Sequence, residues 1–185
     1  MIKFLGLLSK KKKVKPDTAV SIYVALLQNV ISGGFIEIKD FINNNNNLAS
    51  NPNLNDTDID WFSNVIFLGN MKNLDLYFEE EEASILRALI LDEMYKDVQD
   101  NAQHLAIERF LDYENYFKDL LAKHEFPISA MAHAIFEKYN INDFQGDLFK
   151  KKNKPNPIFI NELKNLLNHF IWNWQEYLEK NKLHF

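Results

Sequence analysis

The sequence predicts an all-α protein, a single-domain bundle of six or seven helices with a short N-terminal arm. Apolar residues recur every three or four positions along most of the 185-residue chain, which is the period of an amphipathic helix. Only five Gly and five Pro interrupt the pattern, too few for the many turns of a β protein. Hydrophobic residues make up 46% of the chain, enough for one sizeable core.

The first expected elements are an arm and a long helix. Residues 1–15 are apolar and then rich in Lys, and we separate them as an arm from a helical domain over residues 16–185. Pro16 and Asp17 are favoured at the start of a helix, and the apolar positions that follow keep helical spacing. The long helix is therefore expected to begin at this Pro-Asp pair.

A pair of glycines predicts where this helix ends. Gly33 and Gly34 favour a C-terminal cap, because glycine adopts the left-handed backbone conformation without steric cost. A short second helix is expected over residues 35–42, where apolar side chains share one face. Residues 43–55 are rich in Asn and contain a Pro, so they predict an exposed loop.

The rest of the chain has helical periodicity with one further break. Residues 140–157 are polar and rich in Lys, and they predict a second loop. Four consecutive glutamates at positions 79–82 open the most strongly periodic segment, since acidic side chains suit the positive end of the helix dipole. Helices are expected over residues 56–69, 79–98, 101–121, 127–139 and 157–178.

Charge is sorted along the chain. Residues 1–15 carry a net charge of +6, residues 16–149 carry −15 and residues 150–185 carry +4. The acidic excess is greatest over residues 75–125, which hold 14 acidic and five basic side chains. Such a surface repels phosphates and attracts basic proteins, so we expect no direct binding of nucleic acid.

Several signatures of enzymes and cofactor sites are absent from the sequence. There is no Cys, which excludes disulfides, thiolate zinc sites and a Cys nucleophile. There is also no glycine-rich phosphate loop, Gly-x-Ser-x-Gly turn, His-Glu-x-x-His helix or Glu-x-x-His pair. We therefore expect no metal and no cofactor, and a non-catalytic role is favoured over an enzyme.

The leading hypothesis is a non-catalytic protein-binding module. Its acidic helical face would engage or neutralise a basic protein partner, in the manner of an immunity protein or an inhibitor, because complementary charge speeds association and adds specificity. The competing interpretation is a solvated face whose charge only keeps the protein soluble. The predicted partner-binding residues are Asp75, Glu79, Glu80, Glu81, Glu82, Asp92, Glu93 and Asp97.

The first alternative function is a peripheral membrane adaptor or assembly factor that uses the arm. Its apolar side chains would enter the interface of an anionic membrane, and its lysines would meet the headgroups. The competing interpretation is an N-terminal segment that packs on the core. The predicted membrane contacts are Phe4, Leu5, Leu8, Lys10, Lys11, Lys12 and Lys13. The start of the chain lacks the pattern of a signal peptide, so we expect a cytoplasmic protein, peripheral to the inner face of a membrane if the arm binds there.

The second alternative is a metal-dependent or acid–base enzyme. His104 and Glu108 lie four positions apart, with Asp100 four positions earlier, so a helix would place them on one face. His133 and Glu137 repeat the spacing, and imidazole with carboxylate suits either a metal or proton transfer. A solvated polar face and a structural His are the competing interpretations, because a site would need residues that converge from different helices.

Overall fold

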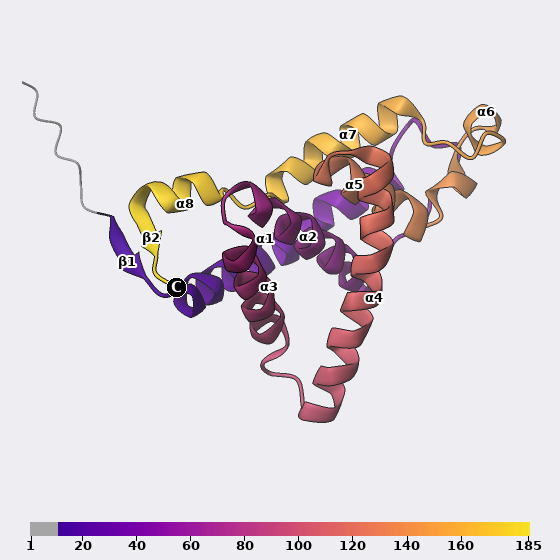
Figure 1. Cartoon of the computed structure of the whole chain (residues 1–185). Coiled ribbons are helices and arrows are strands. Elements are labelled where there is room, and N and C mark those ends of the chain that lie inside the picture. Colours follow the sequence, from indigo (N-terminus) through magenta and orange to yellow (C-terminus); the bar gives the residue numbers. More distant parts are fainter. Residues whose placement is uncertain (1–10) are drawn as a thin grey trace, which may run out of the picture.

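The computed structural model describes residues 11–185 and confirms an all-α fold (Figure 1). The chain is 75% helical, and seven helices within the described residues are longer than one turn. The α-helices are α1 (Pro16–Asn43), α2 (Ile59–Asn73), α3 (Glu80–Tyr95), α4 (Asp100–His124), α5 (Pro127–Lys138), α6 (Asp147–Lys150), α7 (Pro157–Leu167) and α8 (Trp174–Lys180). Short 3-10 helices are η1 (Asp56–Asp58), η2 (Leu74–Leu76), η3 (Ile141–Phe144) and η4 (Asn168–Phe170).

The core is built around α2. Residues 65–71 of this helix are all buried, which means that other elements cover it on every side. That cover comes from α1, α4 and α5, while α7 packs on α5 and α3 packs on α1. At Gly69 a Cβ atom would overlap the Met131 side chain of α5, so this glycine gives the buried Met131 side chain its space between α2 and α5.

α1 is longer than the sequence predicts. It continues through Gly33 and Gly34 to Asn43, so the predicted break and the separate helix over residues 35–42 are wrong. Gly34 serves a contact between distant parts of the chain instead of a cap, because a Cβ atom at this position would lie 2.6 Å from Cζ of Phe170. This glycine makes room for an aromatic ring from the far end of the chain, and the buried positions of α1 keep their helical spacing beyond it.

By length and composition alone, α1 is the one helix of the described chain that could cross a membrane. Nine of its residues are nevertheless buried among other parts of the protein. Within this fold α1 is therefore a core helix, and its opposite face lies at the surface.

The two ends of the described chain meet in a small parallel sheet. β1 (Lys12–Val14) pairs with β2 (Asn181–Leu183), with Lys13 opposite Lys182. The predicted arm of residues 1–15 therefore joins the body through its last residues, while residues 1–10 lie outside the described part. A strand of three residues is too short to show a period, which is why the sequence does not reveal it.

The two predicted loops contact each other. The Asn-rich segment is irregular from the end of α1 to η1, whereas the Lys-rich segment contains η3 and α6. The prediction of one plain loop over residues 140–157 is therefore too simple. Leu48 and Gln145 form an isolated antiparallel bridge, and the buried Gln145 side chain accepts a hydrogen bond of 2.6 Å from the backbone N–H of Asn156. This buried amide anchors a segment that its composition would leave in solvent.

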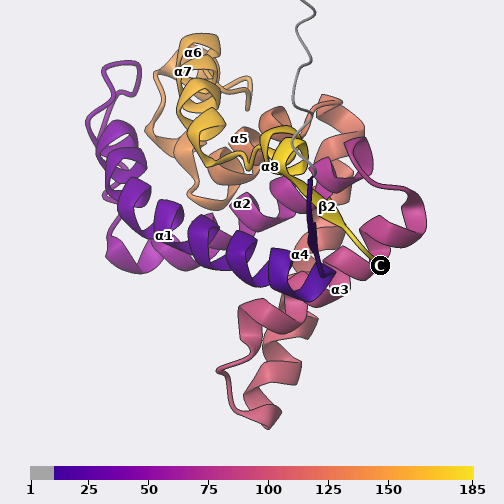
Figure 2. The ribbon, with the colours of Figure 1, turned by 90° about the vertical axis from the view of Figure 1, so that its left-hand side faces the viewer.

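α3 and α4 form a hairpin that projects from the body (Figure 1). The two helices are joined by residues 96–99 and draw apart toward the body, where α2 lies between them. Figure 2 shows the same hairpin from the side, extending away from α1. The candidate site lies between α3 and α4, where the two helices draw apart.

Candidate functional site

The hairpin holds a cleft of about 720 Å³ between α2, α3 and α4. Its floor is apolar. Leu68 and Met71 of α2 lie there side by side at helical spacing, and Phe117 and Leu121 of α4 lie opposite them. The first three of these side chains are almost fully buried, so the floor is a continuation of the core.

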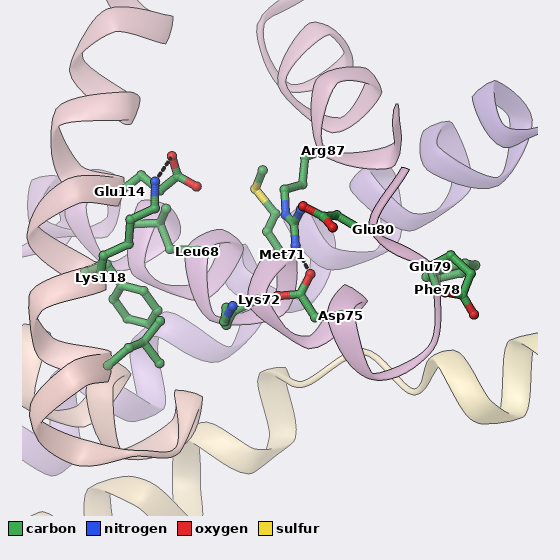
Figure 3. A pocket seen from close by; sticks show the side chains of 12 residues that line it. Leu68, Met71, Lys72, Asp75, Phe78, Glu79, Glu80, Arg87, Glu114 and Lys118 are labelled. Carbon is green, nitrogen blue, oxygen red and sulfur yellow. Dashed lines mark hydrogen bonds and ion pairs between the residues drawn. The ribbon is translucent and has the colours of Figure 1, made fainter. Parts of the chain in front are cut away.

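Charged side chains form the rim of the cleft (Figure 3). On the side of η2 and α3, Asp75 pairs with both Arg87 and Lys72, and its oxygen lies 2.6 Å from the Lys72 amine. Partial burial raises the pKa of Asp75, but the Lys72 hydrogen bond and the Arg87 charge outweigh it and hold the pKa below its usual value. On the α4 side, Lys118 pairs with Glu114 at 3.1 Å. The rim is therefore ordered by ion pairs within the described chain.

The predicted partner-binding residues are divided between three places. Asp75, Glu79 and Glu80 line the cleft. Glu81 and Asp92 are exposed on α3, on a stripe that also carries the exposed Ile85. The remaining three residues lie elsewhere on or after α3. The Glu82 carboxylate accepts a hydrogen bond of 3.4 Å from the Glu79 N–H, and Glu93 pairs with Lys96 at 2.8 Å. Asp97 is exposed in the turn to α4.

The cleft itself is less acidic than the sequence predicts. Four acidic and three basic side chains line it, so most of the net charge of residues 75–125 lies outside it. Exposed acids on α4 carry part of that excess, namely Glu108, Asp112 and Asp119. Sequence reasoning missed the apolar floor, because its residues belong to the same periodic stripes as the core.

The residues of the enzyme hypothesis do not converge. His104 and Glu108 are exposed on α4, and twenty residues of helix place His104 about 30 Å from His124. His133 instead stacks on His124, with ring centroids 3.6 Å apart and ring planes 13° apart. Among the described residues no three His, Asp or Glu side chains are placed to hold a metal ion. The side chain of Asp100 lies outside the described part.

The stacked histidines border a second cavity of about 780 Å³. Glu137 and Lys154 also line it, and the Glu137 carboxylate accepts a hydrogen bond of 2.6 Å from the Tyr116 hydroxyl. Partial burial and the neighbouring His124 lower the pKa of His133 to about 4, although Glu137 opposes the shift. Most of the side chains that line this cavity are polar, and Phe136 and Pro155 are its apolar members.

A measurable pH dependence follows from the His133 site. The unfolded chain binds a proton at this ring below a pH of about 6.5, whereas the folded chain binds it only near pH 4. Stability is therefore expected to fall as the pH drops from about 6.5 towards 4. Urea unfolding of the His133→Gln variant should lose less stability between pH 7 and pH 5 than the wild type. The exposed His104→Gln variant is the control and should follow the wild type; equal pH dependence in all three proteins would contradict the assignment.

The predicted membrane contacts are only partly described. Phe4, Leu5, Leu8 and Lys10 lie outside the described residues. Lys11, Lys12 and Lys13 are exposed, and the last two belong to β1. A cavity of about 390 Å³ lies beside them and is also lined by Ile22 of α1.

Comparisons of this chain with protein-family models, with curated proteins and with solved structures find no match. The arguments for function therefore come from the cleft, its rim and the exposed faces of the helices.

Proposed function

We propose that this protein is a non-catalytic binding module whose cleft between α3 and α4 receives a basic segment of a partner protein. The observation that carries the proposal is the combination of an apolar floor and carboxylates at the rim, in the most acidic part of the chain. The floor supplies a place to bury one apolar side chain, which is worth about 1.5–3 kcal/mol. The carboxylates at the rim favour a partner that carries positively charged side chains next to that apolar residue.

The carboxylates available to a partner lie at the first turn of α3. Within residues 11–185, Glu80 and Glu81 form no ion pair, in contrast to Asp75. Both side chains are exposed, and Glu80 lines the cleft. A Lys or Arg of the partner would pair with them while a neighbouring apolar residue enters the floor.

The surrounding charge supports the same partner. Residues 75–125 carry a net charge of −9, and an acidic field of this kind raises the association rate of a basic protein and lowers it for an acidic one. Because this steering is screened by salt, binding should weaken as ionic strength rises. If the partner is an enzyme or a toxin, occupation of the cleft would be the means of neutralising it.

Reversal of the two available charges tests the proposal. The Glu80→Lys/Glu81→Lys variant should bind a basic partner at least about tenfold more weakly, a loss of about 1.4 kcal/mol. The measurement is capture of proteins from a cytoplasmic extract of the native cell at low and high salt, followed by titration of the captured protein. Glu176→Lys/Glu179→Lys on α8 makes the same change of charge at exposed positions that do not line the cleft, and it should bind as the wild type does.

Two results would contradict the proposal. One is the absence of any salt-sensitive partner at low ionic strength. The other is a partner that binds the Glu80→Lys/Glu81→Lys variant and the wild type equally well. Both variants should remain helical by circular dichroism, because all four positions are exposed and acidic residues in the first turn of a helix such as α3 contribute only about 0.3–1 kcal/mol each.

A further inference from the structure

α1 has a second face that is largely exposed within the described chain, and Ile22 at its N-terminal end borders the cavity beside β1. Ile22, Leu26, Val30 and Ile36 lie along it with 42–56% of their surface exposed. Their spacing of four, four and six residues places them in one stripe, about 21 Å long. Figure 2 shows α1 running across the front of the molecule, with β1 at its N-terminal end.

The chemistry of this face is unusual for an exposed helix. No charged residue occurs from position 18 to position 36, in a chain of which 25% is charged. The other exposed positions between the apolar side chains are small or carry amides, including Ala25, Asn29 and Gly33. Gly33 has open space around its Cβ position, so nothing within the described chain requires a glycine there. Exposed apolar stripes of this kind mark sites of association.

We infer that this face of α1 binds the same face of a second copy of the chain, with the two helices antiparallel. The stripe is self-complementary about Asn29. When the two Asn29 residues meet at a twofold axis, Ile22 of each copy lies opposite Ile36 of the other. Ala25 then lies opposite Gly33, and these small residues allow the helices to approach closely. An amide pair at the axis would fix the register, as a single polar residue does in a coiled coil.

The charges at the two ends of α1 favour the antiparallel arrangement. Lys12, Lys13 and Lys15 are exposed at the N-terminal end, and Glu37 and Asp40 are exposed at the C-terminal end. In an antiparallel pair each basic end faces an acidic end, whereas a parallel pair would bring like charges together. An anionic membrane fits the face less well, because it would attract one end and repel the other.

The dimer is independent of the proposed cleft. No residue of α1 lines that cleft, so association through α1 would leave it open. A partner-binding experiment and a dimerisation experiment can therefore fail separately.

Solution mass is the first test. The full chain, of 21.8 kDa, should sediment with twice that mass at about 100 μM. Leu26→Glu should be monomeric at the same concentration, because each interface would then bury two unpaired carboxylates; a rise in Kd of at least about tenfold is expected. Leu148→Glu, on α6 and 62% exposed, is the matched control and should stay dimeric. Both positions are exposed, so both variants should fold.

Cysteine cross-linking tests the orientation, and the cysteine-free chain makes it specific. Asn29→Cys should give a disulfide-linked dimer under mild oxidation, while Asn115→Cys on the exposed side of α4 should not. Ala25→Cys and Gly33→Cys should cross-link when mixed but not when each is alone. Cross-linking of Ala25→Cys with itself would indicate a parallel pair and contradict the arrangement.

Three results would overturn the inference. The first is a wild type that stays monomeric at 100 μM and gives no Asn29→Cys dimer. The second is a monomer that binds phosphatidylserine vesicles and loses that binding in Leu26→Glu, which would assign the face to a membrane. The third is a monomer that dimerises only when residues 1–10 are deleted, which would assign the face to the chain's own N-terminal segment.

Discussion

Asn70→Leu is expected to lower the free energy of unfolding by about 2–5 kcal/mol, since each buried polar group left without a partner costs about 1–3 kcal/mol. The Asn70 side chain is buried in α2 and bonds to a segment about 100 residues further along the chain. Its amide donates to the Phe170 carbonyl at 2.9 Å, and its oxygen accepts the Trp172 N–H at 2.7 Å. Leucine has a similar volume but would leave both backbone groups unpaired.

The matched control is Asn161→Leu, which makes the same chemical change at an exposed position on α7. It should alter stability by no more than about 0.5 kcal/mol. Urea unfolding at pH 7 measures both variants. If the two lose the same stability, the bridge from α2 to the segment before α8 does not hold the C-terminal part of the chain in place.

The helical content could be predicted because α2, α3 and α5 each carry several turns of apolar repeats. A repeat of that length outweighs weak local signals. The break expected at Gly33 and Gly34 was wrong for a related reason. A cap signal is local, whereas the packing of the Phe170 ring against Gly34 depends on a residue 136 positions away that no local pattern reveals.

The acidic side of the candidate site could also be predicted, but its shape could not. Asp75, Glu79 and Glu80 were identified from charge alone, and the divergence of α3 from α4 brings them to one rim. The distance between those two helices decides whether Phe117 lies inside the core or lines the floor of a cleft. The apolar periodicity of the sequence is the same in both cases, so it cannot distinguish them. The pairing of Asp75 with Arg87 likewise depends on tertiary placement, because Arg87 lies twelve residues further along the chain.

Trp174→Ala is expected to lower the free energy of unfolding by about 3–5 kcal/mol, the usual effect of removing a large aromatic side chain from a core. Trp174 is almost completely buried at the start of α8. It stacks on Tyr23 of α1, with centroids 5.4 Å apart, and meets the edge of Phe78 at 5.2 Å. Its indole N–H has no acceptor within the described chain, so apolar packing accounts for its contribution. Trp174→Phe, which keeps an aromatic ring without the N–H, should therefore lose less than half as much stability.

Trp174→Ala should also loosen one side of the cleft, because Phe78 packs on Trp174 and lines the cleft beside Glu79. In Trp174→Ala the ring of Phe78 loses a main support, and the junction of η2 and α3 should open more often. Amide hydrogen exchange of residues 76–80 should then accelerate by a larger factor than exchange in α5, which packs mainly on α2, α4 and α7. Uniform acceleration would mean that the variant is only less stable globally. Selective acceleration would mean that the C-terminal helix holds the rim on which a basic partner is proposed to bind.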